Sequence, residues 1–225
     1  MDDNKKIITY KDIKQSPEVR AYIKQADISL AALGLTEHSF AHVTKCAEVA
    51  GKLLQDLDYE PRKVELAKIA AFMHDIGNVI NRVDHAQSGA MMAFWILDKM
   101  GMPYEETAMI INAIGNHDEG TAYPVNAIAA AVIIADKSDV RRSRVRDKKT
   151  IFSDIHDRVN YAVEKAELIM NKEDKEIVLN LKIDTSISSV MDYFEIFLQR
   201  MLLCRKAANF FGLDFKLNIN DSEQA

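Results

Sequence analysis

The sequence predicts an all-α helical bundle with a small C-terminal α/β appendage. Apolar residues recur at helical spacing through most of the first 150 positions, and prolines and glycines mark the ends of these segments. The 225 residues include only 8 glycines and 4 prolines, which favours long helices over hairpins. Apolar and polar residues alternate over residues 177–183, where we expect a strand.

Local signals set the boundaries of the helices. Ser16 and Pro17 are a typical N-cap and first helical residue, and Gly34 ends that helix. A turn lies near Tyr59, and Gly101 ends the fourth helix. We expect helices over residues 17–33, 39–57, 61–73, 84–100, 103–116 and 124–136, the last of which continues into the basic stretch that follows.

After residue 150 the sequence pattern predicts strands as well as helices. We expect a helix over residues 153–170, the strand over 177–183, a long helix over 186–211 and a short strand over 215–219. The last residues, from 221 on, are expected to fray. This organisation predicts an N-terminal helical extension (1–35), a helical core (36–150) and a C-terminal region (151–225) with a short two-stranded element that packs on the core.

Composition narrows the class of protein. Hydrophobic residues make up 48% and charged residues 28% of the chain, which is ordinary for a globular domain. A net charge of −5 argues against a nucleic-acid binder that works through bulk positive charge. The two cysteines are far apart, the first residues contain no apolar signal segment, and no apolar run approaches a membrane span. We therefore expect a cytoplasmic protein without a membrane contact.

Histidines and aspartates are spaced so that helical hairpins bring them together. His42 lies 17 residues before Tyr59, and His74 and Asp75 lie 15 and 16 residues after it. At a rise of about 1.5 Å per residue, all three lie about 24 Å from the turn, at the open end of one hairpin. His85 and His117 are each about 16 residues from the next turn. The short segment 77–84 joins the two open ends.

The facing of the helices supports the same interpretation. Val125, Ala129, Val132 and Asp136 form one stripe, so that Asp136 continues an apolar face toward the core. A buried carboxylate without a partner is costly. No lysine or arginine is expected on the inward faces near the site. We therefore expect a metal ion as the counter-charge.

The pattern resembles the H…HD…D signature of the HD superfamily of metal-dependent phosphohydrolases. His42, the adjacent pair His74 and Asp75, and Asp136 match that signature. The segment that starts with His85 resembles the H-x-x-x-G-A stretch of the two-metal branch, and His117 resembles its next ligand block. Asn116 stands where the cyclic-di-GMP-cleaving subgroup has a further histidine, so that activity is not expected.

The resemblance implies an HD-domain helical bundle with a centre of two divalent metal ions bridged by Asp75. Its ligands would be His42, His74, Asp75, His85, His117 and Asp136, and Asp75, His74 and His117 are the residues assigned to catalysis. Four imidazoles and two carboxylates suit Mn, Fe, Co, Ni or Zn, with Mg as an alternative. The expected reaction is hydrolysis of a phosphoester or phosphoanhydride in a nucleotide or other small phosphorylated metabolite by metal-activated hydroxide.

Basic and amide side chains near these positions are candidates for substrate contacts. Lys137, Arg141, Arg144 and Lys148 would share one face if the helix continued past Asp136. That face would either bind substrate phosphate or form a solvated basic surface or a partner contact. Asn78 and Asn116 flank ligands and would orient water or substrate, although cap and turn roles explain them equally well. An apolar stripe after residue 193 is interpreted either as core packing or as the face of a homodimer.

Two alternatives stay open at this point. Some relatives with the same six ligands use a di-iron centre to activate oxygen and cleave a carbon bond. A sensor that binds a nucleotide without catalysis is the other alternative. The basic stretch favours a small phosphorylated substrate and does not distinguish the two enzymes.

Overall fold

The computed structural model describes residues 7–149 and 151–224. Part of the predicted N-terminal extension (1–6), the predicted boundary residue Thr150 and the terminal Ala225 lie outside the described residues. The elements in chain order are α1 (Tyr10–Gln15), α2 (Pro17–Ala32), α3 (Phe40–Asp56), α4 (Pro61–Met73), η1 (Ile76–Val79), α5 (His85–Met100), α6 (Tyr104–Gly115), α7 (Ala127–Lys137), η2 (Arg142–Arg144), α8 (Ile155–Ala162), β1 (Val163–Asn171), β2 (Glu176–Ile183), α9 (Val190–Phe210), β3 (Asp214–Ile219) and β4 (Ser222–Glu223).

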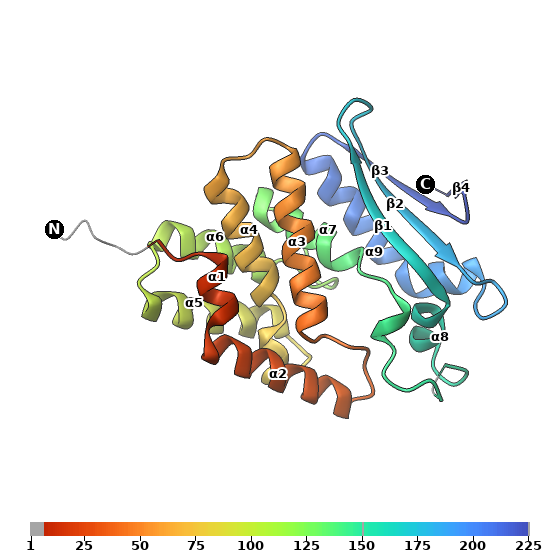
Figure 1. Ribbon diagram of the computed structural model, residues 1–225, viewed down its shortest axis with the longest axis horizontal. Helices are drawn as coiled ribbons and strands as arrows, with labels where there is room; N and C mark the ends of the chain where they lie inside the picture. The colour runs from red at the N-terminus through yellow and green to blue at the C-terminus, as the bar shows by residue number, and fades with distance from the viewer. Residues whose placement is uncertain (1–6, 150, 225) are drawn as a thin grey trace.

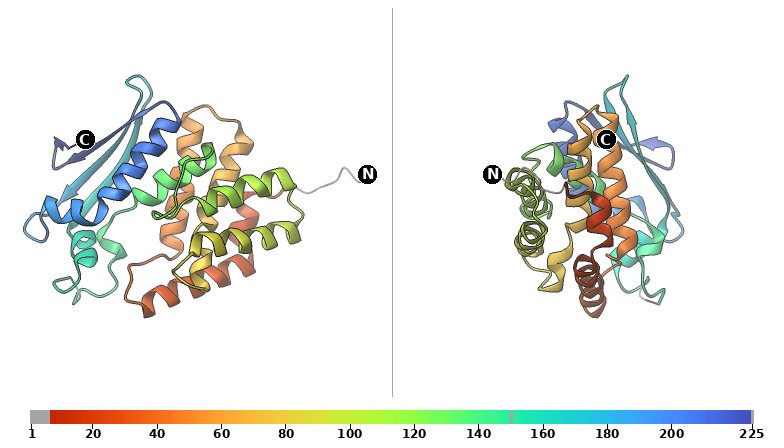
Figure 2. Two further views of the ribbon diagram at one scale, coloured as in Figure 1. Left: turned by 180° about the vertical axis from the view of Figure 1, so that it is seen from behind. Right: turned by 60° about the vertical axis from the view of Figure 1, so that its left-hand side comes forward.

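Two antiparallel helical hairpins, α3–α4 and α5–α6, make up the body of the bundle, and α7 packs against α3, α4 and α6 (Figure 1). Helix α2 lies across the end where η1 joins the two hairpins. Figure 2 shows α5 and α6 on one side of the α3–α4 pair and the C-terminal sheet on the other. The expected pairing of the hairpins is therefore observed.

Helix α7 is the centre of the core. Every residue from Ala127 to Ala135 is buried, so this helix is apolar on all its faces rather than along one stripe. A helix of this kind is stable only when neighbours cover it completely. Helices α3, α4, α6 and α9 provide this cover. Because α7 is enclosed, its C-terminal turn carries Asp136 to the interior of the bundle.

The C-terminal region is a small four-stranded sheet with one long helix. The strand order is β1-β2-β3-β4, with β2 and β3 parallel and the outer pairs antiparallel. Helix α9 connects the two parallel strands, as such strands require, and packs on both β3 and α7. The α/β appendage expected from the sequence is present, with four strands instead of two.

The helix expected over residues 153–170 is wrong in its second half. Helix α8 ends at Ala162, and residues 163–171 form β1. Glutamate, lysine, alanine, leucine and methionine in this segment favour a helix locally. However, β1 pairs with β2 from Val163 to Asn171, and its inward residues Leu168 and Met170 pack against the core. Tertiary pairing thus overrides local propensity. Residues 222 and 223, expected to fray, pair with β3 as β4.

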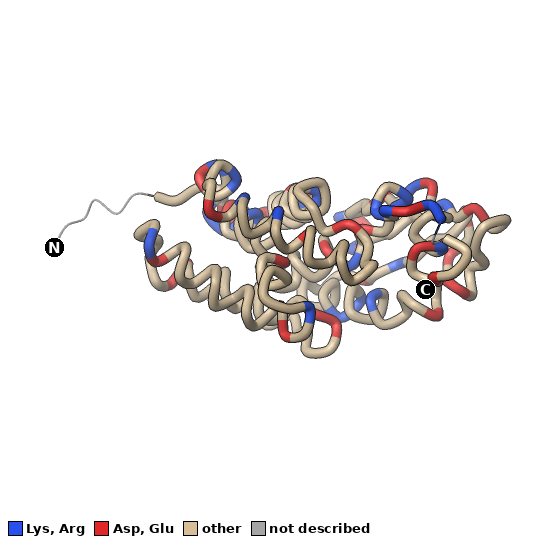
Figure 3. The backbone as a smooth tube through the Cα atoms, turned by 90° about the horizontal axis from the view of Figure 1, so that it is seen from below, with Lys and Arg blue, Asp and Glu red and all other residues tan. Residues whose placement is uncertain are grey.

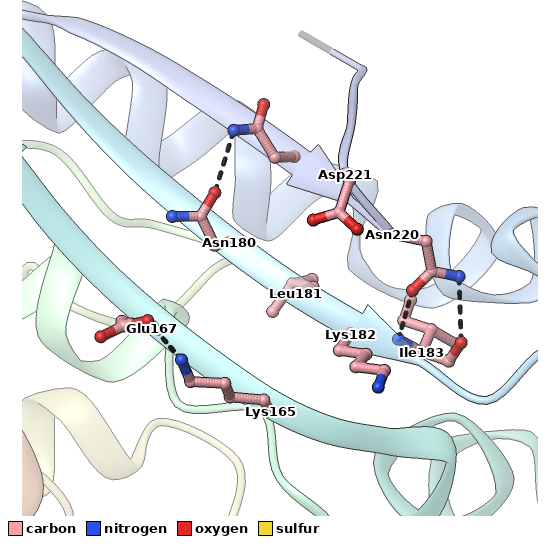
Figure 4. A pocket seen from close by; sticks show the side chains of 9 residues that line it. Lys165, Glu167, Asn180, Leu181, Lys182, Ile183, Asn220 and Asp221 are labelled. Carbon is pink, nitrogen blue, oxygen red and sulfur yellow. Dashed lines mark hydrogen bonds and ion pairs between the residues drawn. The ribbon is translucent and has the colours of Figure 1, made fainter.

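The outer face of the sheet is polar. Asn218 donates to Asn180 (2.9 Å), and Lys165 pairs with Glu167 (2.7 Å), as Figure 4 shows. These residues line an open cavity of about 620 Å³ together with Lys182. The cavity contains none of the histidines or aspartates singled out above. It is separate from the predicted metal site.

Lysines and arginines are interspersed with aspartates and glutamates along the chain, as Figure 3 shows from below. Among the helices of residues 7–149 and 151–224, none combines the length and the apolar character that a membrane crossing needs.

Gly77 fixes the contact between η1 and α5, and this contact yields a first prediction. A Cβ at this position would collide with the backbone oxygen of His85 and lie 2.5 Å from the backbone nitrogen of Gly89. Backbone atoms cannot move aside as a flexible side chain would. We expect Gly77→Ala to destabilise the fold by about 2 kcal/mol or more, measured by urea denaturation. Gly115→Ala is the matched control, because its Cβ meets only Ala90 at 3.8 Å; equal stability of the two variants would contradict the prediction.

Candidate metal centre

Six side chains converge where the two hairpins and α7 meet. His42 lies on the first turn of α3, His74 caps the end of α4, and Asp75 follows it directly. His85 is the first residue of α5, and His117 comes directly after the cap of α6. Asp136 lies on the last turn of α7. All six are buried or nearly so: His42, His74, Asp75, His85, His117 and Asp136.

Asp75 lies between two groups of nitrogen and oxygen atoms. Its Oδ2 atom is 3.2 Å from His74 Nε2 and 3.6 Å from His42 Nε2. Asp136 Oδ1 completes this first group, 3.4 Å from His42 Nε2 and 3.7 Å from His74 Nε2. The Oδ1 atom of Asp75 faces the second group, 3.5 Å from His85 Nε2 and 3.8 Å from His117 Nε2. One carboxylate therefore faces both groups, one oxygen to each.

The four imidazoles are oriented through their other nitrogens. The Nδ1 atoms of His74, His85 and His117 lie 2.7, 3.0 and 2.6 Å from the backbone oxygens of Ala71, Arg82 and Ile114. His42 Nδ1 lies 2.8 Å from Asp139 Oδ2. An Nδ1–H that donates to such an acceptor places the lone pair on Nε2. All four Nε2 atoms consequently point toward the carboxylates of the site, and each presents its lone pair there whenever its ring is neutral.

The spacing of these atoms fits bound metal ions. Two atoms held at about 2.1 Å from one ion at tetrahedral angles lie about 3.4 Å apart. The separations given above range from 3.2 to 3.7 Å in the first group. In the second group they range from 3.1 to 3.8 Å, and the shortest joins His85 Nε2 and His117 Nε2. His74 Nε2 and Asp75 Oδ2 are buried without a hydrogen bond within the described chain, as expected of atoms that bind a cation.

Burial and charge shift the pKa values of the cluster in opposite directions. Burial alone would lower the pKa of His74, but the carboxylates of Asp75 and Asp136 outweigh it and raise this pKa to about 10. Burial lowers the pKa of His85 to about 4 and also lowers that of His117. Burial would raise the pKa of Asp75, but the cationic His74 ring outweighs this effect and keeps it well below its usual range.

Lys137 corrects one expectation from the sequence. No cationic side chain was expected near the inward face of Asp136, yet Lys137 Nζ lies 2.7 Å from Asp136 Oδ2 and is itself buried. The next residue of a helix points about 100° away, but the long lysine stem reaches back to the carboxylate. Asp136 Oδ2 therefore has a protein partner, and only its Oδ1 atom faces the histidines.

The helix does not continue past Lys137, so the expected basic face does not form. Residues 142–144 form the short helix η2, and Arg144 is buried there, where it donates to the backbone oxygens of Glu37 and Asp139. Arg141 binds Glu37 and Asp139. Both arginines hold the loop before α3 against the loop after α7. Of Lys137, Arg141 and Arg144, only Lys137 contacts one of the six clustered residues directly.

The two asparagines have different environments. Asn78 is buried and donates to Asp75 Oδ1 (2.9 Å), so it orients the carboxylate that faces both groups. Asn116 is half-buried and donates to the backbone oxygen of Asn112, which is a cap interaction.

Sequence reasoning missed two charged residues around the histidines. Asp139 is buried and accepts from His42, Lys45 and Arg141. Its position, three residues after Asp136, was the only available signal. Arg82 lies beside the second group, with NH1 3.0 Å from His85 Nε2. Nothing in its spacing marked it, because it lies in the irregular segment between η1 and α5.

Cys46 lies at the edge of the first group. Its sulfur is 3.7 Å from both ring nitrogens of His42 and 3.7 Å from the backbone oxygen of Ala135. Burial raises the pKa of this thiol well above its usual value, so it stays neutral. It packs as a small core residue.

Comparisons with known proteins agree with this geometry. The family model described as "HD domain" matches residues 39–142, a segment that contains all six clustered residues. An uncharacterized protein of Methanocaldococcus jannaschii is 26% identical over 83% of this chain and 79% of its own length. Ribonuclease Y of Enterococcus faecalis is 31% identical over 48% of this chain, and ribonuclease Y 1 of Pediococcus pentosaceus is 32% identical over 59%. These matches span only 19% and 23% of the two ribonucleases.

A solved structure of a predicted HD superfamily hydrolase from an uncultured Thermotogales bacterium is 25% identical, with a TM-score of 0.44. It covers 55% of this chain and 67% of its own. The HD model matches residues 39–142, which carry the His74–Asp75 pair at the centre of the helical bundle, and this match supports assignment of that segment to the HD superfamily.

Proposed function

We propose that this protein is a metal-dependent phosphohydrolase of small phosphorylated metabolites, nucleotides included. The observation that carries the proposal is the convergence of four histidine Nε2 atoms on the two oxygens of Asp75, with Asp136 beside His42 and His74. His42, His74 and Asp136 would hold one divalent ion, His85 and His117 a second, and Asp75 would bridge them. Such ions acidify water toward neutral pH and stabilise negative charge on phosphoryl oxygens.

The residues of the chain have separate tasks in this proposal. Asn78 donates to Asp75 and fixes the orientation of the bridging carboxylate. Asp139 holds His42 through Nδ1 and keeps Nε2 directed inward. Lys137, beside Asp136, is placed to offset charge on a substrate phosphate. No side chain is needed as a covalent nucleophile.

The relatives support phosphorus–oxygen chemistry at this site. Two of them are named ribonuclease Y, and RNA is a phosphodiester. The net charge of −5 and the interspersed charges of Figure 3 favour a small substrate over a nucleic-acid strand for this chain.

The test is anaerobic purification with metal analysis, followed by a panel of nucleotides and phosphoesters under Mn and Fe. Release of phosphate without oxygen is the expected result. Turnover that occurs only in the presence of oxygen would overturn the proposal in favour of a di-iron oxygenase. Nucleotide binding without turnover under any metal would favour a sensor.

Asp75→Ala should abolish both retention of metal and hydrolysis, because each proposed ion loses its shared oxygen. Metal content by elemental analysis and phosphate release are the measurements. Asp98→Ala, an exposed position on α5, is the matched control and should keep both. Full activity of a folded Asp75→Ala variant would rule out the proposed mechanism.

Asp139→Asn should weaken metal binding by about tenfold to a hundredfold, because the carboxylate that orients His42 loses its charge. Competition with a chromogenic chelator measures this affinity. The circular dichroism spectrum should stay unchanged, since an asparagine oxygen still accepts from the ring. If a folded Asp139→Asn variant bound metal as tightly as the wild type, the role of Asp139 would be limited to its ion pairs with Lys45 and Arg141.

Metal uptake should release protons at neutral pH. With a pKa of about 10, His74 carries a proton in the metal-free protein, and the ion must displace it. Apparent affinity should therefore rise about tenfold per pH unit up to that pKa and be weakest in acid. Calorimetry at pH 7.5 in buffers of different ionisation enthalpy should report about one proton per chain from this ring. His156→Ala, at an exposed histidine, should release the same number; absence of any release would contradict the assignment.

A further inference from the structure

The C-terminal helix α9 brings an arginine to the edge of the candidate metal centre. Arg200 Nε lies 2.5 Å from Glu119 Oε1, and the same oxygen lies 3.8 Å from Lys137 Nζ. Lys137 Nζ in turn contacts Asp136 Oδ2 at 2.7 Å. A continuous series of ion pairs therefore runs from the candidate ligand Asp136 to the appendage, through Glu119, two residues after His117.

The guanidinium of Arg200 is held on two sides. Its Cζ atom lies 4.6 Å from the centre of the Phe197 ring, one turn earlier on α9. Its Nε atom is in ion-pair contact with Glu119 without making a hydrogen bond, and its terminal nitrogens make no hydrogen bond within residues 7–149 and 151–224. The side chain is 25% exposed. A guanidinium that stacks on a ring and forms an ion pair on its Nε side keeps its terminal edge for bidentate binding of an oxyanion.

The charge balance changes when the centre holds cations. Without them, Lys137 and Arg200 stand against two carboxylates, Asp136 and Glu119. Once divalent ions offset Asp136, the two basic groups share only Glu119. One positive charge is then in excess beside the centre, in a partly buried place where charges are weakly screened.

We propose that Lys137 and Arg200 form a second anion-binding subsite, and that the preferred substrates carry a second phosphate in addition to the one hydrolysed. This inference rests on the proposed phosphohydrolase function and adds the substrate class, small molecules with two phosphate groups. It also gives the C-terminal region a role, since the arginine comes from α9. A purely structural ion pair that fastens α9 to the core is the opposing interpretation.

The test uses two probes that cannot be hydrolysed, propylphosphonate and 1,3-propylenediphosphonate. Their dissociation constants are measured by calorimetry on the metal-loaded full chain, with metal content checked afterwards. Arg200→Met should weaken diphosphonate binding by about tenfold or more and leave monophosphonate binding unchanged, as expected for the loss of charged hydrogen bonds. Arg205→Met, at an exposed position of the same helix, is the matched control and should bind both probes as the wild type does.

A structural role predicts a different result. Arg200→Met would then lower the melting temperature and alter binding of both probes equally, or of neither, and the inference would be overturned. Arg200→Lys is a second variant for the case that Arg200→Met misfolds, because it keeps the positive charge and removes only the planar guanidinium. It should weaken binding of the diphosphonate by less than Arg200→Met does and leave binding of the monophosphonate unchanged.

The inference and the proposed function fail in different ways. Hydrolysis of phosphoesters by a wild type that shows no preference for the diphosphonate would overturn only the second subsite. A metal-loaded wild type that binds neither probe and hydrolyses nothing would overturn both.

Discussion

The site depends on one repeated interaction, an imidazole Nδ1–H that donates to an acceptor outside the cluster. Three of the four acceptors are backbone oxygens three residues earlier, at Ala71, Arg82 and Ile114. The oxygens of Ala71 and Ile114 belong to the last turns of α4 and α6, where the final carbonyls lack partners within the helix. The end of each helix thus orients the histidine that follows it. The residue at which α4 or α6 ends therefore also determines where Nε2 of His74 or His117 points.

This dependence explains why the cluster could be predicted from spacing. A hairpin with arms of equal length brings residues equidistant from its turn to the same depth, and the lengths of α3 to α6 follow from proline and glycine signals. The number of residues from the turn predicts how far along the hairpin a side chain lies, but it does not predict which residues that side chain contacts. Lys137, Asp139 and Arg82 were missed or misplaced because their contacts depend on where α7 ends and how the irregular segments fold.

The C-terminal region shows the same limit for secondary structure. Strand β2 alternates cleanly and was predicted, because one of its faces is buried and the other is polar. Strand β1 consists largely of helix-favouring residues and is a strand because β2 pairs with it. Because its partner β2 follows only after a turn, the residues of β1 alone do not indicate that this segment is a strand. Long-range pairing is the part of this fold that local patterns could not provide.

Charge balance links the fold to the need for cations. Asp139 is offset by Lys45 and Arg141, which leaves Asp75 and Asp136 as the carboxylates that face the histidine Nε2 atoms. Lys137 offsets one of them. Asp75 lies beside His74, and the carboxylates of Asp75 and Asp136 together raise the pKa of this ring to about 10, so that His74 carries a proton at neutral pH. A bound divalent ion would take the place of the proton on His74 and would bring further positive charge to these two carboxylates. The same excess of charge, passed on through Lys137, makes the edge of the centre attractive to a phosphate.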